Sequence, residues 1–203
     1  MDPVPIKSKS KSKSLFQIIK EILQFAWCYW KTPNNIGFVL PSSEKVSRTV
    51  VNNIQNPEES LVVEIGAGTG VITSHIIQKG VLAKNLYVVE YDSNLFKILE
   101  KKFPMLDHLY NIDAANLSST LPKDIIGQVD YVISTIPLLL LPLEKCQEIL
   151  KEAKRVLKPN GVFLQVTLTP FVPKYIKELG MKAKRAGVCC ANIPPAFVWR
   201  YFL

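Results

Sequence analysis

Residues 62–70 read Val62-Val63-Glu64-Ile65-Gly66-Ala67-Gly68-Thr69-Gly70, an apolar run followed by a glycine at every second position. The apolar run predicts a buried strand, and the glycines predict a tight turn whose backbone can approach a ligand closely. A turn that binds a dinucleotide needs the spacing G-x-G-x-x-G, but Val71 stands where its third glycine would be. The stretch therefore predicts a nucleotide-binding type of fold that takes a cofactor other than a dinucleotide.

Acidic residues stand at or just after three of the predicted strands. Glu64 precedes the glycines, where a carboxylate repels a pyrophosphate but accepts hydrogen bonds from a ligand that carries an ammonium. Glu90 ends the second strand and is expected to accept both hydroxyls of a ribose. Asp113, within Asn111-Ile112-Asp113-Ala114, follows a third strand and is expected to meet an adenine amino group. A ligand that combines an ammonium, a sulfonium and an adenosine fits these positions.

Along the rest of the chain, apolar runs alternate with helical patterns, which is typical of a doubly wound, mostly parallel sheet of the α/β class. The predicted strands cover residues 61–65, 86–90, 129–134 and 162–168, and the predicted helices cover 44–54, 71–79, 93–102 and 143–157. A tight turn is expected at Lys158-Pro159-Asn160-Gly161, and an antiparallel pair at 181–188 and 196–203, joined through Asn192, Pro194 and Pro195. A chain of 203 residues with 48% hydrophobic residues can form one such domain.

The formal net charge of +8 is concentrated at the two ends of the chain. Residues 1–31 carry six Lys against Asp2 and Glu21, and residues 171–203 carry four Lys and two Arg against Glu178. A lipid surface and a phosphodiester backbone both attract such basic segments without sequence recognition. The charge therefore indicates an anionic partner and leaves both kinds open.

The N-terminal residues divide into a polar and an apolar part. Lys and Ser alternate over residues 7–14, so residues 1–14 are expected to be disordered, either as a solvated tail or as an electrostatic tether. Over residues 15–31 the polar positions recur at helical spacing and leave a wide apolar face. This helix either packs on its own domain or a partner subunit, or lies in the headgroup layer of a membrane. The expected organisation is a basic tail over 1–14, an amphipathic helix over 15–36 and a main domain over 37–203.

Cysteine and histidine positions favour neither a disulfide framework nor a metal site. The four Cys stand at positions 28, 146, 189 and 190, and His75 and His108 are isolated, so no metal is expected. No window reaches the roughly 18 uncharged apolar residues of a membrane-spanning helix. The N-terminus lacks the pattern of a secretion signal, which makes the cytoplasm the expected location.

Residues 61–168 resemble the class I S-adenosylmethionine-dependent methyltransferases in the glycine turn and in the acidic residues that follow it. Four segments spread over nearly the whole chain resemble the bacterial phospholipid N-methyltransferases: Gly37-Phe38-Val39-Leu40-Pro41-Ser42-Ser43, Val89-Glu90-Tyr91-Asp92, Ser134-Thr135-Ile136-Pro137-Leu138-Leu139-Leu140-Leu141-Pro142 and Asn192-Ile193-Pro194-Pro195-Ala196. The resemblance implies a Rossmann-like, seven-stranded sheet preceded by the amphipathic helix, with S-adenosyl-L-methionine as cofactor and S-adenosyl-L-homocysteine as product. It implies that phosphatidylethanolamine is methylated one to three times toward phosphatidylcholine. It also implies that residues 1–31 hold the protein on the anionic inner face of the cell membrane. No sequence feature sets an oligomeric state.

The motifs and this resemblance together assign the candidate site residues. The cofactor is expected to contact Glu64, Gly66, Ala67, Gly68, Thr69, Gly70, Glu90, Tyr91, Asp113, Ala114 and Ser134. The substrate is expected to contact Tyr29, Ser42, Ser43, Thr135, Pro137, Arg200 and Tyr201. Tyr91 is the first candidate for orienting the amine, because an aromatic ring also holds a partly methylated ammonium, and Tyr29 and Tyr201 are the alternatives. Ser42 and Ser43 also suit the N-cap of a helix, and Arg200 is expected to meet the lipid phosphate.

The ribosomal RNA adenine dimethyltransferases also resemble this chain, since they share the glycine turn and would use a basic surface. After the fourth strand those enzymes carry an Asn-x-Pro-aromatic loop that hydrogen-bonds and stacks an extruded adenine. Here the loop is Ser134-Thr135-Ile136-Pro137-Leu138, which has neither the amide nor the ring, and leucines follow to Leu141. These leucines suit acyl or glycerol contacts, or else start a helix that enters the core. Lipid amine methylation is therefore expected and nucleic acid is disfavoured. Adenine N6-dimethylation and a non-catalytic lipid- or RNA-binding module are the alternatives.

Overall fold

The computed structural model describes residues 44–190 and 195–202, which belong to one compact unit, Val39–Leu203. The expected tail over 1–14 and the expected helix over 15–36 lie outside the described residues. The site candidates Tyr29, Ser42 and Ser43 also lie outside them, as do Asn192 and Pro194 of the expected C-terminal connection.

The domain is built on a seven-stranded sheet in the order β3-β2-β1-β4-β5-β7-β6. The strands are β1 (Val62–Ile65), β2 (Leu86–Val89), β3 (Leu109–Tyr110), β4 (Val129–Ser134), β5 (Leu157–Thr167), β6 (Lys182–Cys189) and β7 (Ala196–Phe202). Strands β1 to β5 pair in parallel, whereas β7 pairs antiparallel with both β5 and β6. The predicted doubly wound α/β sheet and the antiparallel pair at its C-terminal end are confirmed.

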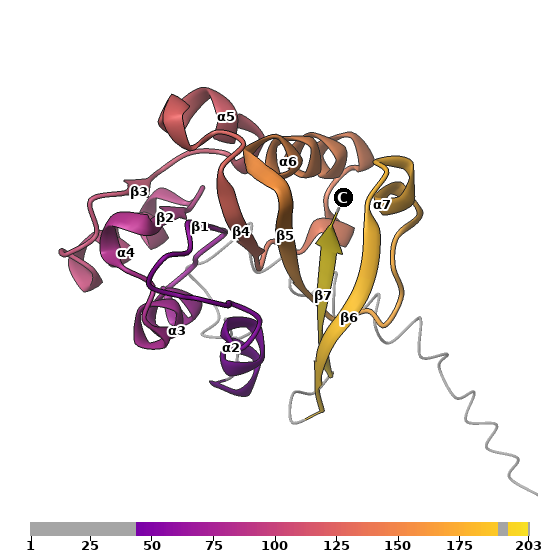
Figure 1. Ribbon diagram of the computed structural model, residues 1–203, viewed down its shortest axis with the longest axis horizontal. Helices are drawn as coiled ribbons and strands as arrows, with labels where there is room; N and C mark the ends of the chain where they lie inside the picture. Colours follow the sequence, from indigo (N-terminus) through magenta and orange to yellow (C-terminus); the bar gives the residue numbers. More distant parts are fainter. Residues whose placement is uncertain (1–43, 191–194, 203) are drawn as a thin grey trace, which may run out of the picture. The chain divides into compact units, whose positions relative to one another are not determined.

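Helices cover both faces of the sheet, and every residue of β1 and β2 is buried. Figure 1 shows α5 and α6 on one side of the sheet and α2 and α3 on the other. The helices are α2 (Glu44–Val51), α3 (Val71–Lys79), α4 (Ser93–Lys102), α5 (Leu117–Thr120), α6 (Leu143–Val156) and α7 (Lys174–Glu178). Short 3₁₀ turns are η1 (Ala83–Asn85), η2 (Ala114–Asn116), η3 (Lys123–Ile125) and η4 (Leu138–Leu140). Burial on both faces explains why the central strands read as nearly continuous apolar runs.

The two helices that flank the candidate site begin and end where the sequence predicts. Gly80 ends α3 in the left-handed conformation, with φ at 107°, and its N–H bonds back to Ile77 O. Asp92 caps α4, because its side chain accepts the backbone N–H groups of Asn94 and Leu95. Local capping signals therefore set both helices.

Helix α2 is shorter than predicted, ending at Val51 rather than at residue 54. The backbone N–H of Asn53 bonds to Val50 O, and that of Ile54 bonds to Val51 O, both three residues back. The last turn therefore tightens into a 3₁₀-like end. Its carbonyls accept N–H groups three residues later, whereas in a continuing α-helix they would accept N–H groups four residues later.

The turn predicted over residues 158–161 lies within β5. Between the pairs Val129↔Leu157 and Tyr131↔Val162, β4 advances by two residues while β5 advances by five. The additional residues leave the ladder and form an irregularity of the bulge type. A Cβ at Gly161 would lie 2.8 Å from Val129 O, so this irregularity requires a glycine there.

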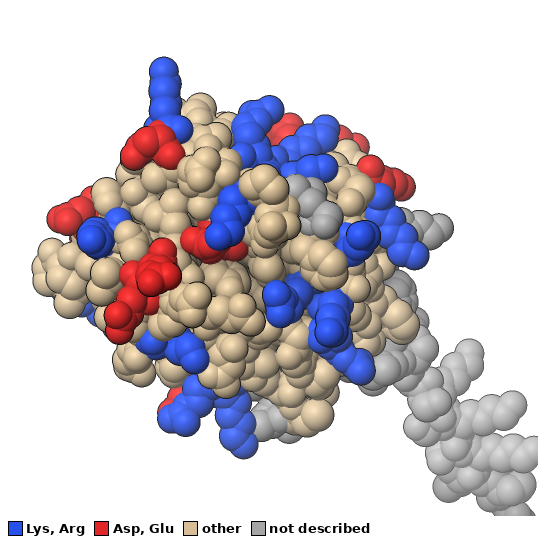
Figure 2. All heavy atoms as spheres, viewed as in Figure 1, with Lys and Arg blue, Asp and Glu red and all other residues tan. Residues whose placement is uncertain are grey.

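Strand β6 forms one edge of the sheet and carries exposed cations. Lys182, Lys184 and Arg185 are exposed, and Arg200 of β7 pairs in register with Lys184. Figure 2 shows Lys and Arg side chains gathered on the side of the molecule where Figure 1 places β6 and β7. The described part of the basic C-terminal segment thus lies mainly along one sheet edge.

The core consists of two layers, one on each face of the sheet. Side chains of α2 and α3 pack on the first face, together with Val62, Val88, Ile133 and Leu164 of the central strands. The buried residues of α6 include Ile149, Leu150, Ala153 and Val156. Because side chains alternate along a strand, Val63, Ile65, Val132 and Phe163 face this second layer. The carboxyl ends of β1 to β4 lie at one edge, between the two layers.

Substitution of Gly70 by Ala is expected to destabilise the fold. Gly70 has φ of +75°, and an added Cβ would lie 2.3 Å from a ring carbon of Phe103 and 2.8 Å from Leu99 Cδ2. Gly127→Ala is the matched control, since Gly127 has φ of +77° but no atom within 4 Å of the added Cβ. The control carries only the left-handed strain of about 1–2 kcal/mol. Overpacking adds about 1–3 kcal/mol at Gly70, so its variant should unfold at lower urea concentration. Equal midpoints would contradict this account.

Candidate functional site

The glycine turn after β1 bends over the end of β2. Gly66, Gly68 and Gly70 all have positive φ, at +73°, +60° and +75°. The N–H groups of Gly66 and Ala67 both bond to Val89 O, at 2.9 and 3.3 Å. At Gly68 no heavy atom of the described residues, its two chain neighbours aside, lies within 4 Å of the position a Cβ would take. The turn thus has an open side next to Gly68, where a ligand can approach its backbone.

Glu90 joins the glycine turn to the loop after β2. Its Oε2 accepts the N–H of Gly68 at 2.7 Å, and its Oε1 accepts the N–H of Asp92 at 2.8 Å. The side chain is nearly fully buried, and this burial raises the pKa of Glu90, while the two backbone N–H groups oppose the rise. Each carboxylate oxygen keeps a further lone pair, so Glu90 can still accept hydrogen bonds from a ligand.

Glu64 lies beneath α3, on the sheet face of the first core layer. Its Oε2 accepts the Thr73 hydroxyl at 2.7 Å, and Oε1 has no hydrogen-bond partner among the described residues. Burial raises the pKa of Glu64 to about 8; the Thr73 hydrogen bond lowers the value and the nearby charge of Glu90 raises it. A buried oxygen without a partner is costly, so it marks a place where a hydrogen-bond partner is missing.

Asn111 organises the loop that carries Tyr91. Its side-chain amide donates to Glu90 O at 2.8 Å and to Tyr91 O at 3.0 Å, and its oxygen accepts the Ser93 hydroxyl at 2.8 Å. The Tyr91 side chain itself is 68% exposed. Asn111 was not among the predicted site residues, although its position directly after β3 was the available signal.

Asp113 and Ala114 lie at the start of η2, after β3. Asp113 Oδ1 accepts the N–H of Ala115 at 2.9 Å, and Oδ2 pairs with Lys145 Nζ of α6 at 2.7 Å. The hydrogen bond to Asp113 raises the pKa of Lys145. Sequence reasoning missed Lys145, because only the packing of α6 against η2 brings the two residues together.

The loop after β4 packs directly against the glycine turn. The Thr135 hydroxyl donates to Gly66 O at 2.5 Å, and a Cβ on Gly66 would lie 2.7 Å from the Cγ1 atom of Ile136. Ser134 is buried, and its Oγ accepts the Ile136 N–H at 3.3 Å. Pro137 precedes η4, which carries the leucines. The motif Ser134-Thr135-Ile136-Pro137-Leu138 therefore forms one wall of the candidate site.

The structure brings together the candidates on the loops after β1 to β4, including Thr69, whose carbonyl accepts Lys102 Nζ of α4 at 3.0 Å. The candidates on β7 lie farther from those that follow β2. Four strand steps lie between β2 and β7, which corresponds to about 19 Å. As neighbours along β7, Arg200 and Tyr201 face opposite sides of the sheet. Tyr201 is buried and stacks on Phe163, with ring centroids 5.8 Å apart. The described residues contain no group of three His, Cys, Asp or Glu that could hold a metal ion.

Comparisons with known proteins agree with this geometry. The family described as "Methyltransferase domain" matches residues 62–161. An ornithine lipid N-methyltransferase of Singulisphaera acidiphila is 32% identical over 156 residues, which cover 76% of this chain and 81% of that protein. Ribosomal RNA small subunit methyltransferase A of Hydrogenobaculum is 36% identical over 103 residues, which cover 50% of this chain and 40% of that protein. Magnesium protoporphyrin IX methyltransferase of Synechocystis, solved with bound S-adenosylmethionine, aligns with a TM-score of 0.56 at 15% identity. That alignment covers 96% of this chain and 99% of that one.

Glu64→Gln is expected to change how stability depends on pH. An unfolded Glu ionises near 4.5, whereas folded Glu64 stays protonated up to about 8, so the folded protein holds the additional proton between these values. Stability is therefore lost as pH rises through this window, at up to about 1.4 kcal/mol per pH unit. The variant keeps an acceptor for Thr73 but does not titrate. Its free energy of unfolding, measured in urea without cofactor, should therefore rise relative to that of the native protein from pH 5 to pH 8. Exposed Glu59 supplies the control Glu59→Gln; parallel profiles for all three proteins would contradict the assignment.

Proposed function

The chain belongs to the class I S-adenosylmethionine-dependent methyltransferases, and we propose that it methylates the amine of a lipid, phosphatidylethanolamine first among the candidates. S-adenosylmethionine supplies a methyl group on a positively charged sulfur, and S-adenosylhomocysteine is the product. The similarity to an ornithine lipid N-methyltransferase, over 81% of that protein, supports a lipid amine as acceptor. Phosphatidylethanolamine is favoured by the four motifs that resemble the bacterial phospholipid N-methyltransferases.

The residues at the carboxyl ends of β1 to β3 fit this cofactor. The open side of Gly68 leaves space that a side chain would fill, and Glu90 beside it has lone pairs for ribose hydroxyls. The unpartnered oxygen of Glu64 fits the donor chemistry of an ammonium. Asp113 and Ala114 are proposed to contact the adenine, with Lys145 holding the Asp113 carboxylate in position. In this assignment the chain's own part is to bind, orient and shield the reacting groups.

The loop after β4 is the observation that carries the choice of acceptor. Thr135 and Ile136 hold this loop against the glycine turn, so its side chains stand next to the proposed cofactor site. The loop has no side-chain amide and no ring to hydrogen-bond and stack a flipped base. It continues instead into η4, where Leu139 is 40% exposed. An apolar surface at this position suits the body of a lipid.

Adenine methylation of ribosomal RNA is the second candidate. It is favoured by the similarity to ribosomal RNA small subunit methyltransferase A and by the cations along β6. The chain spans less than half of that relative, however, and the loop after β4 lacks the groups that bind the base. We therefore rank it below the lipid amine.

Attachment to the membrane is proposed from the sequence. The apolar face predicted over residues 15–31, preceded by the Lys-Ser run, suits the headgroup layer of an anionic membrane. Within residues 44–190 and 195–202, no helix is long and apolar enough to cross a bilayer. The proposed location is therefore the inner face of the cell membrane, with the protein bound peripherally from the cytoplasm.

The proposed activity is tested by offering phosphatidylethanolamine, ornithine lipid and ribosomal RNA side by side and measuring methyl transfer from labelled S-adenosylmethionine. Labelled phosphatidylethanolamine is the expected product. Glu90→Gln should weaken cofactor binding by roughly tenfold or more in calorimetry, because an amide cannot accept both backbone N–H groups. Glu100→Gln, on the exposed side of α4, should bind as the native protein does. If the labelled methyl group appeared in RNA and in neither lipid, the lipid assignment would be refuted.

Removal of residues 1–31 should abolish binding to vesicles that contain anionic phospholipid, since both the lysines and the apolar face are lost. Sedimentation of the full chain and the shortened chain with such vesicles measures this. Unchanged sedimentation of the shortened chain would count against the interfacial helix. Cofactor binding, measured in parallel, should be the same for both chains.

A further inference from the structure

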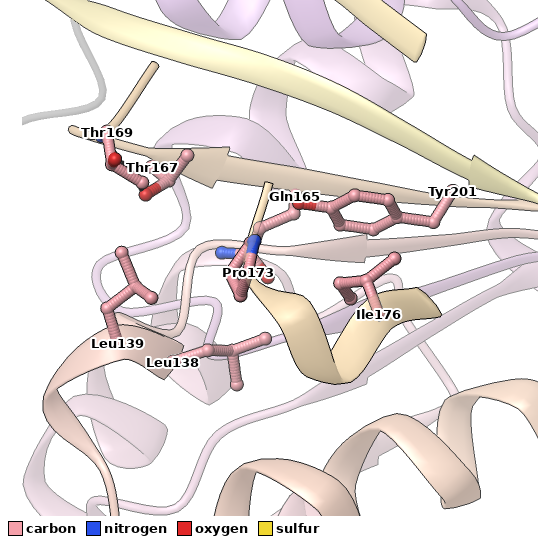
Figure 3. A pocket seen from close by; sticks show the side chains of 8 residues that line it. All are labelled: Leu138, Leu139, Gln165, Thr167, Thr169, Pro173, Ile176 and Tyr201. Atoms are coloured by element: carbon pink, nitrogen blue, oxygen red, sulfur yellow. Dashed lines mark hydrogen bonds between the residues drawn. The ribbon is translucent and has the colours of Figure 1, made fainter. Parts of the chain in front are cut away.

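A pocket lies between η4, β5, α7 and β7. Its lining consists of Leu138, Leu139, Gln165, Thr167, Thr169, Pro173, Ile176 and Tyr201. Figure 3 shows these eight side chains around a common space, with the leucines on one side and Gln165 and Tyr201 across from them. The hollow measures about 280 Å³ when the open solvent at its mouth is included. It can hold a small group rather than a whole lipid.

Gln165, which lines this pocket, carries an unused hydrogen-bond acceptor. Its Nε2 donates to Ile136 O at 2.9 Å and to Val166 O at 2.6 Å. Because both partners are carbonyls, the NH₂ group must face them and the amide oxygen must face away. Gln165 is 4% exposed, and its Oε1 has no partner in the described part of the chain. Such an oxygen fits a ligand that donates an N–H or O–H.

Tyr201 adds a further polar group to this lining, which also contains Thr167 and Thr169. Its ring packs on Phe163, and none of the hydrogen bonds found within the described ranges involves its hydroxyl. Burial raises the pKa of Tyr201, so the hydroxyl stays uncharged. Among the described residues that line the pocket, Tyr201 is the only titratable one, and none of them is a carboxylate or a cation. The pocket therefore suits an uncharged donor and neither an isolated anion nor an isolated cation.

The pocket adjoins the proposed cofactor site through Ile136. Gln165 holds the Ile136 carbonyl, and the Ile136 side chain touches the glycine turn at Gly66. Gln165 lies level with Ser134, which in turn lies level with Ile65, so it stands two strand steps, about 10 Å, from the end of β1.

Two exposed apolar side chains belong to the pocket lining or stand next to it in the chain. Leu139 belongs to the lining and is 40% exposed, and Phe171, between two lining residues in the chain, is 74% exposed. Exposed side chains of this kind suit contact with a lipid.

We propose that this pocket receives the amine of the methyl-accepting lipid, whose N–H donates to Gln165 Oε1 and to the Tyr201 hydroxyl while the lipid body lies over Leu139 and Phe171. The proposal rests on the proposed function and names Tyr201, rather than Tyr91, as the tyrosine beside the amine. With no carboxylate among the described lining residues, burial favours the uncharged amine over the ammonium. The uncharged form has the lone pair that accepts a methyl group.

Calorimetry on the purified full chain tests the pocket without any methyl transfer. The probes are octylamine and N,N,N-trimethyloctylammonium, which have the same chain but differ in N–H groups. Gln165→Leu removes the acceptor, Tyr201→Phe removes only the hydroxyl, and Gln128→Leu, at an exposed position outside the pocket, is the matched control. Circular dichroism confirms folding, and if Gln165→Leu fails to fold, Tyr201→Phe decides.

The native chain should bind octylamine roughly tenfold or more tightly than the trimethylated probe, and Gln165→Leu should lose about that factor. Tyr201→Phe should weaken the binding of octylamine severalfold, whereas Gln128→Leu should leave it unchanged. Apparent affinity for octylamine should rise by up to about tenfold per pH unit between pH 7 and 9, as the uncharged fraction grows.

Native-like octylamine binding by the folded pocket variants overturns the proposal. So does equal binding, or no binding, of the two probes by the native chain. Lipid methylation with an unchanged KM in Gln165→Leu also refutes the pocket while the function stands. Amine binding in the pocket without any lipid methylation refutes the function alone.

Discussion

The carboxylate of Glu90 holds two turns in one arrangement, and the candidate site depends on it. One oxygen takes the N–H of Gly68 and the other takes the N–H of Asp92, so the turn after β1 and the start of α4 cannot move independently. Asn111 extends this arrangement to the loop after β3, and Thr135 extends it to the loop after β4. Four loops from distant parts of the sequence are thereby connected into one edge of the sheet.

The fold could be predicted because its signals are local. Apolar runs mark strands that are buried on both faces, and capping residues such as Gly80 and Asp92 mark the ends of helices. The structure differs from the predicted elements where pairing between distant segments decides the local conformation. The register of β5 against β4 turns an expected turn into an irregularity within one strand, and no property of residues 158–161 alone announces which of the two will form.

The site residues, too, could be predicted where the signal is local and could not be predicted where it depends on tertiary packing. Residues directly after parallel strands could be placed at a common edge from topology alone, which accounts for Gly68, Glu90 and Asp113. Lys145 lies in the first turn of α6 and Gln165 lies near the end of β5, and their roles arise from partners that only tertiary packing supplies. The two tyrosines show the limit of sequence proximity: Tyr91 is beside Glu90 in the chain but exposed, whereas Tyr201 is remote in the chain and buried in the lining of a pocket.

The cations along β6 have a consequence for solubility. Among the described strands β6 lies at one edge of the sheet, and unpaired edge strands tend to recruit strands from other molecules. Lys182 and Lys184 place repelling charges where a second copy would have to align, and Arg185 adds to them. The charges that suit an anionic surface thus also discourage edge-to-edge aggregation, and an anionic surface that neutralises them would weaken this protection.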